Sequence, residues 1–271
     1  MESLSVPSVR LAAFLVVGVL LWALETRFPL FPHGANRRAH AVTNLALTAL
    51  TLLMYMLLGA ATAAAAVWTA ANGVGFLSLT NWNPLVEGLI AIVALDLFAY
   101  FAHVSMHKIG VGWQAHQVHH SDPAVDVTTA LRQHPIESLW RVTWQLAGVV
   151  IFGVALLPLV VYLTLSGINA LFEHSNITLP KVVDRVLRLV WVTPDMHKWH
   201  HSRRQQETDS NYGNLLSVWD RTLGTYTPAG DLQQIRYGLD GLDSSDRQRF
   251  AGLIRLPFDP TAIAMPPMRH R

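Results

Sequence analysis

Long apolar stretches alternate with short polar ones along the first two thirds of the chain. Three of them, residues 11–31, 41–71 and 84–102, are long enough to cross a bilayer core of about 30 Å, which takes roughly 20 apolar residues in a helix. A fourth runs without a charged side chain from Val142 to Phe172, with Pro158 near its middle. Because proline interrupts a helix, this stretch predicts a short helical hairpin that enters the membrane and turns at Pro158.

Charges between these stretches predict the orientation. No charged side chain occurs from Ala41 to Val86, whereas Arg37 and Arg38 lie between the first two stretches. The positive-inside rule places this arginine pair in the cytoplasm, so the third span also ends there, and charged residues become frequent from Lys181 onward. We predict an all-α multi-span membrane helix bundle, with about three full spans plus a helical hairpin and a cytoplasmic histidine-rich helical cap.

Composition agrees with a membrane protein, because 51% of the 271 residues are hydrophobic and only 14% are charged. The chain has no cysteine, which excludes disulfides and thiolate metal sites. A formal net charge of +2 is too small to indicate a nucleic-acid partner. The composition, rich in alanine and arginine, favours a bacterial inner membrane with the histidines on the cytoplasmic side.

Histidines carry the most informative spacing. The motif HxxHH occurs twice, in "HQVHH" and in "HKWHH", and on a helix these i, i+3 and i+4 positions share one face. An HxxxH pair, "HVSMH", precedes them, and the predicted hairpin brings the histidines that flank it to the same side. The ten candidate metal ligands are His103, His107, His116, His119, His120, His134, His174, His197, His200 and His201.

Ten imidazoles exceed what one metal accepts, because zinc sites take four ligands and octahedral iron at most six. Two metals are therefore implied. Imidazole suits iron, zinc, copper and nickel, so the ligand type leaves the element open.

Carboxylates beside the ligands could orient the imidazole rings. Glu137, Glu173, Asp195 and Asp209 lie near histidines in sequence, and Asp96 lies seven residues before His103 within a predicted span, where a carboxylate is costly. Structural alternatives remain open: a helix-end charge for Glu173, a helix cap for Asp195 and a buried hydrogen-bond partner for Asp96.

Six segments resemble, in order and spacing, the fatty acid hydroxylase and sterol desaturase superfamily of histidine-rich membrane di-iron oxygenases. They cover residues 96–226, about half the chain, and read "DLFAYFAHVSMH", "WQAHQVHHSD", "TTALRQHPIE", "FEHSNI", "TPDMHKWHHSR" and "DSNYGNLLSVWDRTLGTY". The resemblance carries the family's metal ligands onto all ten histidines, with His134 as the remaining member of the set. It also points to Asp209, Asn211 and Tyr212 of "DSNYG", for which a structural turn is the alternative.

The resemblance implies an O₂-dependent oxidoreductase that binds two iron ions and uses external electrons. It would hydroxylate, or less readily desaturate, an unactivated C–H bond of a lipid that enters from the bilayer. The sequence contains no haem or flavin motif, so the electron donor is expected to be a separate ferredoxin or a cytochrome b5-like protein with its reductase. The expected organisation is an N-terminal transmembrane hairpin (1–83), a di-metal catalytic domain (84–227) and a C-terminal tail that packs on the cap (228–271).

Three other functions compete with this one. A zinc-dependent membrane hydrolase lacks support, because there is no HExxH or serine-nucleophile motif and ten histidines are too many for one open zinc site. A metal transporter would spread its histidines along a path through the bilayer, whereas here they are predicted to cluster on one side, outside the spans. A non-catalytic membrane protein stabilised by metal also stays open, and the sequence does not name the lipid.

Overall fold

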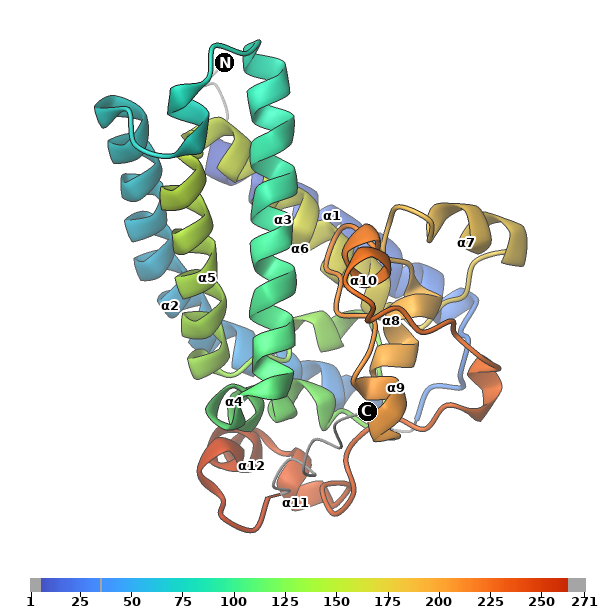
Figure 1. Cartoon of the computed structure of the whole chain (residues 1–271). Helices are drawn as coiled ribbons and strands as arrows, with labels where there is room; N and C mark the ends of the chain where they lie inside the picture. Colours follow the sequence, from blue (N-terminus) through green and yellow to red (C-terminus); the bar gives the residue numbers. More distant parts are fainter. Residues whose placement is uncertain (1–5, 35, 263–271) are drawn as a thin grey trace, which may run out of the picture.

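The computed structural model describes residues 6–34 and 36–262, and this part of the chain is helical, with a single bridge between Trp191 and Leu216 in place of any strand. Four helices are long and apolar enough to cross a membrane: α1 (Val6–Arg27), α2 (Arg37–Asn72), α3 (Pro84–Lys108) and α6 (Leu156–His174). A fifth helix, α5 (Pro135–Phe152), packs between α2 and α3 (Figure 1). The predicted all-α membrane bundle is confirmed.

Local sequence explains where these helices begin and end. Asn83 caps α3 by accepting a hydrogen bond from the Leu85 N–H, and Pro84 supplies a first turn whose missing N–H costs nothing. The α5–α6 hairpin turns at Gly153, which takes a left-handed conformation with φ 68°. The sequence predicted this turn at Pro158, whereas the structure has it earlier, at Gly153. Pro158 lies in the first turn of α6, a position at which proline is tolerated.

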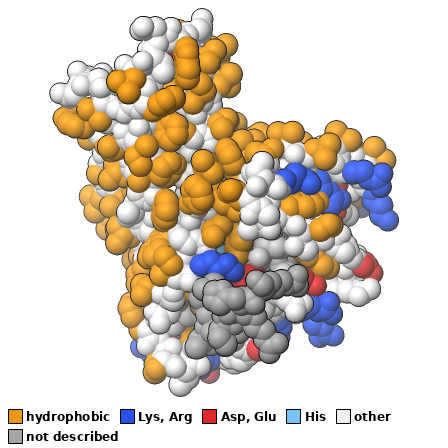
Figure 2. All heavy atoms as spheres, viewed as in Figure 1, with side chains coloured by type: hydrophobic (Ala, Val, Ile, Leu, Met, Phe, Trp, Pro, Cys, Tyr) orange, Lys and Arg blue, Asp and Glu red, His pale blue; other side chains and the backbone are white. Residues whose placement is uncertain are grey.

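The surface of this bundle separates by polarity. Hydrophobic side chains cover the upper part in Figure 2, while lysine, arginine and acidic side chains gather toward the lower and right-hand parts. Many large apolar side chains of α1, α2 and α3 are exposed, among them Leu57 at 64%. Patches of this extent are lipid-facing surfaces rather than water-facing ones.

Short helices form a layer at the end of the spans where α3 finishes. In this layer Leu239, Leu242 and Leu253 pack against Trp113 of α4 (Gly110–His120). Residues 239–253 thus lie against the helix that carries the first HxxHH motif. The remaining helical segments are α7 (Lys181–Leu187), α8 (Pro194–His200), α9 (Gln205–Thr208), α10 (Val218–Thr222), α11 (Ser245–Gln248), α12 (Phe250–Arg255) and the 3₁₀ turns η1 (Phe76–Leu79), η2 (Val127–Leu131), η3 (Leu232–Gln234) and η4 (Leu256–Phe258).

Candidate metal centre

Four helices bring nine of the ten candidate ligands together. The last two turns of α3 carry one pair, and His174 is the last residue of α6. The first HxxHH motif lies on α4, and the second lies on α8 and its C-cap residue, His201. The chain turns sharply from α3 into α4, and a Cβ on Gly112 would lie 2.9 Å from the Met106 Cα. Glycine at this position therefore lets α4 approach the end of α3, which brings their histidines within contact distance.

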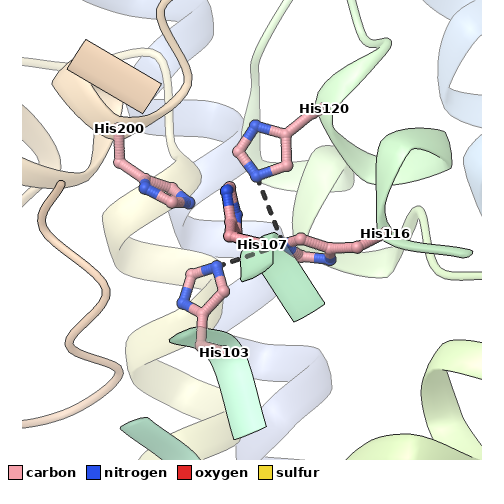
Figure 3. A group of neighbouring side chains, drawn as sticks. All are labelled: His103, His107, His116, His120 and His200. Carbon is pink, nitrogen blue, oxygen red and sulfur yellow. Dashed lines mark hydrogen bonds between the residues drawn. The ribbon is translucent and has the colours of Figure 1, made fainter. Parts of the chain in front are cut away.

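Five histidines form one group, which we call the five-histidine group. His103 and His107 come from α3, His116 and His120 from α4, and His200 from α8 (Figure 3). All five are buried, and one ring nitrogen from each lies within 4.8 Å of the others. The Nε2 atom of His116 lies 3.1 Å from that of His103 and 3.2 Å from that of His120.

The other four form the four-histidine group: His119, His174, His197 and His201. The Nε2 atom of His174 lies 3.0 Å from those of His119 and His197 and 3.2 Å from that of His201. Each HxxHH motif thus contributes an i, i+4 pair to one group and its middle histidine to the other. The pair from α4 joins the five-histidine group, whereas the pair from α8 joins the four-histidine group.

Backbone acceptors indicate that these Nε2 atoms carry lone pairs. The Nδ1–H of His103 donates to the carbonyl oxygen of Tyr212 (2.9 Å). In the same way, His174 donates to Ala170 (2.7 Å) and His200 donates to Ser210 (2.6 Å). A neutral imidazole that donates through Nδ1 is an acceptor at Nε2. Lone pairs that converge at about 3 Å in a dry interior repel each other unless a cation lies between them, so the donor set fits one metal ion in each group.

Protonation would not relieve this repulsion near neutral pH. Burial, reinforced by the neighbouring imidazoles, lowers the pKa of the histidines on α4 and α8 well below the ordinary value of 6.5. Neutral imidazole is the form that binds metals. Both groups are therefore in the ligating state at neutral pH.

Three of the expected carboxylates lie beside these rings. Glu137 Oε1 is 3.1 Å from His116 Nδ1, Asp209 Oδ1 is 3.6 Å from His107 Nδ1, and Glu173 Oε1 is 3.8 Å from His197 Nε2. Burial opposes ionisation of Asp209, but His107 and Lys108 lower its pKa below the usual range. The five-histidine group thus has two carboxylates that can orient its rings, and one of them reaches the surface.

The "DSNYG" segment shapes the wall of the five-histidine group. The Tyr212 ring lies 5.0 Å from that of His107 and 5.5 Å from that of His200, between centroids, and its hydroxyl donates to Asp209. Asn211 has a positive φ of 57°, and its side chain bonds the backbone of Thr227 in both directions. Tyr212 therefore contacts the histidines, while Asn211 holds the turn.

The structure places His134, Asp195 and Asp96 away from both groups. His134 caps α5 by accepting the Ile136 N–H at Nδ1, because the segment that follows η2 turns it toward the helix start. Asp195 accepts a hydrogen bond from the hydroxyl of Thr178. Asp96 accepts bonds from the backbone of Leu215 and Leu216 and from the Trp219 indole, so it fastens the 213–219 loop to α3.

Sequence reasoning missed several residues that support the site. His40 of α2 lies 2.8 Å from Asp122, which follows the first HxxHH motif, and the buried Lys198 ammonium donates to the carbonyl of Ile177 beyond His174. The signal for Lys198 was its place inside "HKWHH". Arg141 was also missed, although it stands four residues after Glu137 at the start of an apolar stretch.

A cavity of about 40 Å³ borders the four-histidine group. Its lining includes Gln133 and Arg141, in addition to histidines, Glu173 and the backbone near Gly213. A larger cavity of about 970 Å³ lies at the α1–α2 connection and touches none of the nine histidines.

A membrane helix bundle with two buried all-histidine groups at one end of its spans defines a class of membrane metalloproteins. Within this class the chain belongs to the fatty acid hydroxylase family, whose model matches residues 88–225, about half the chain. The match includes all nine grouped histidines.

Curated relatives agree with this assignment. The chain is 30% identical over 162 residues to alkylglycerol monooxygenase from Xenopus tropicalis, a match that covers 58% of this chain and 34% of that protein. It is 30% identical over 149 residues to ornithine lipid hydroxylase OlsE from Rhizobium tropici, covering 54% and 43%. A very-long-chain aldehyde decarbonylase from Oryza sativa is 26% identical, covering 55% of both chains. The matches thus span about a third to a half of these relatives. No solved structure matches the chain.

Proposed function

We propose that the protein is a membrane-bound di-iron oxygenase that hydroxylates a C–H bond of a lipid with O₂ and external electrons. The observation that carries this proposal is the pair of buried histidine groups, in which ring nitrogens of five and of four imidazoles converge within 4.8 Å of one another. The relatives named as lipid hydroxylases and monooxygenases support the same chemistry. Desaturation of the same bond is the closest variant of this activity.

In this proposal the five-histidine group holds one iron ion and the four-histidine group the other. Two bound iron ions would supply the activation of O₂ that attack on an unactivated C–H bond requires. Glu137 and Asp209 orient the rings of His116 and His107, and backbone carbonyls fix the tautomers of three others. Burial of all nine imidazoles excludes bulk water from the groups.

The substrate would reach this site from the lipid. The groups lie at one end of the apolar spans, and the cavity beside the four-histidine group is lined from α5 and α6. We place this end at the cytoplasmic face of a bacterial inner membrane, following the arginine pair at Arg37 and Arg38. A ferredoxin, or a cytochrome b5-like protein with its reductase, would deliver electrons there.

The experiment that tests this function combines metal analysis with lipid profiling. Full-length protein is purified in detergent from cells grown with ample iron, and iron and zinc per chain are measured. About two irons per chain, with an O₂-dependent lipid product absent from cells lacking the protein, is the expected result. Two zincs and no iron after anaerobic iron reconstitution would overturn it and favour a hydrolase or a non-catalytic protein.

A further inference from the structure

The small cavity beside the four-histidine group contains an arginine whose charge the protein satisfies only in part. Arg141 lies in the second turn of α5, and its Nε donates to Glu137 Oε1 at 2.8 Å. Among residues 6–34 and 36–262, no acceptor is hydrogen-bonded to either of its Nη atoms. Both Nη groups therefore lack a protein acceptor, in a side chain that is 23% exposed and lines the cavity.

Charged donors without a protein acceptor are costly in a membrane protein unless they face water or a polar ligand. A charged group among apolar helices is normally paired or faces a functional cavity, because losing water without gaining a partner costs free energy. Glu137 does not complete the pairing, because only its Oε1 accepts from Arg141, through Nε, and its buried Oε2 accepts no hydrogen bond. Glu173 faces the same cavity but accepts its hydrogen bond from Asn169. The free side of the Arg141 guanidinium thus matches a ligand oxygen.

Size and position restrict that ligand. A volume of about 40 Å³ admits roughly three water molecules, since one needs about 10–15 Å³ on this measure. A carboxylate or an ester or amide carbonyl fits this volume. The cavity also borders His119, His174 and His197, so an oxygen held by Arg141 lies close to the four-histidine group. The carbon presented for reaction is then only a few bonds from that oxygen.

We propose that Arg141 binds an acyl oxygen of the lipid in this cavity, so that the enzyme oxidises carbons next to the acyl head rather than mid-chain or terminal carbons. A guanidinium favours such oxygens because its N–H groups form a planar fork that matches them. The proposal deepens the function proposed above and rests on it for the reaction, whereas the binding of the acyl oxygen stands on the cavity alone.

Binding to zinc-loaded full-length protein in nanodiscs tests this site without turnover. The probes are radiolabelled hexadecanoate, methyl hexadecanoate and hexadecane, which share a chain length and differ at the head. Wild-type protein should retain hexadecanoate most tightly, the ester less tightly and the alkane weakly. Arg141→Gln should weaken hexadecanoate binding about 10- to 100-fold, the range expected for hydrogen bonds to a charged group, and leave hexadecane unchanged.

Two further variants separate recognition from folding. Arg141→Lys keeps the charge but loses the fork, so it should recover part of the affinity. Arg10→Gln is the matched control, because it removes an arginine of α1 and no residue of α1 lines the cavity. This variant should bind all three probes as the wild type does. Equal hexadecanoate affinity in wild type and a zinc-loaded Arg141→Gln would overturn the proposal, as would equal affinity of the wild type for hexadecanoate and hexadecane. Neither result depends on iron or O₂, so failure of the oxygenase proposal would be seen separately as absence of an oxidised product.

Discussion

The two histidine groups use the same sequence motif in opposite ways. The five-histidine group takes the outer pair of α4 and the middle histidine of α8, and the four-histidine group takes the reverse. Their surroundings differ as well. Glu137 and Asp209 lie beside rings of the first group, whereas the small cavity with Arg141 and Glu173 is lined by three histidines of the second group and only His103 of the first. The four-histidine group therefore borders more of the space that a reacting molecule could enter.

Removing one ligand from each group gives the largest expected effect. His200→Ala and His201→Ala change neighbouring residues that serve different groups. Each should lose about one of two metals and lower activity roughly 100-fold or more, because a catalytic metal stabilises the transition state by several kcal/mol. Elemental analysis of the two proteins measures this, and full metal content in both would contradict the assignment of ligands.

The next largest effect is expected on metal affinity, when the carboxylates beside the five-histidine group are replaced. Asp209→Asn and Glu137→Gln remove the acceptors beside His107 and His116, and metal affinity should fall about 10- to 100-fold, as is usual for partners that orient a ligand. Chelator competition measures the affinity of each metal. Since neither residue contacts the four-histidine group, an equal loss of both metals would argue against two independently supported groups.

Acid should destabilise the metal-free protein. Burial lowers the pKa of the α4 and α8 histidines, so between that lowered value and 6.5 the unfolded chain binds more protons than the folded one. The stability that these histidines contribute should be fully present well above pH 6.5 and decrease as the pH falls below it. Thermal unfolding of apo-protein in detergent at several pH values tests this, and a midpoint that rises on acidification would contradict it.

Asp96→Asn should affect stability rather than metal binding. Its carboxylate accepts from Leu215, Leu216 and Trp219, and an amide would present a donor to one of them. We expect a loss of about 1–3 kcal/mol, the usual cost of a buried group left without its partner. Thermal unfolding reports this change, and the folded variant should keep two metals. A stable variant that lacks metal would instead place Asp96 in the metal site.

The smallest effect is expected at His134. Its Nδ1 caps α5, so His134→Ala should cost about 0.5–2 kcal/mol, whereas His134→Asn should cost less because asparagine is a good cap. Both variants should retain full metal content. Loss of one metal in His134→Asn would restore His134 to the ligand set, and elemental analysis decides between these outcomes.

Much of this arrangement follows from periodicity, and the exceptions have physical reasons. Long apolar stretches predicted the spans, and helical spacing identified the histidines of α3, α4 and α8. Spacing did not predict that His119 and His200 join a different group from the other histidines of their motifs. One helix face covers an arc wide enough for its side chains to reach either group. The place of Arg141 depends on how α5 packs beside α3 and α4, and such contacts leave no local sequence pattern.

The layer of short helices under α4 also includes Gln248, whose half-buried contact with the first HxxHH segment has a consequence for biosynthesis. Gln248 accepts a hydrogen bond from Arg132 and donates one to the carbonyl of Ser121, which follows His120. This support for the first HxxHH segment comes from a residue 127 positions further along the chain. On the ribosome the contact cannot form until those residues have been synthesised, so the end of α4 gains this support well after α4 itself has been made.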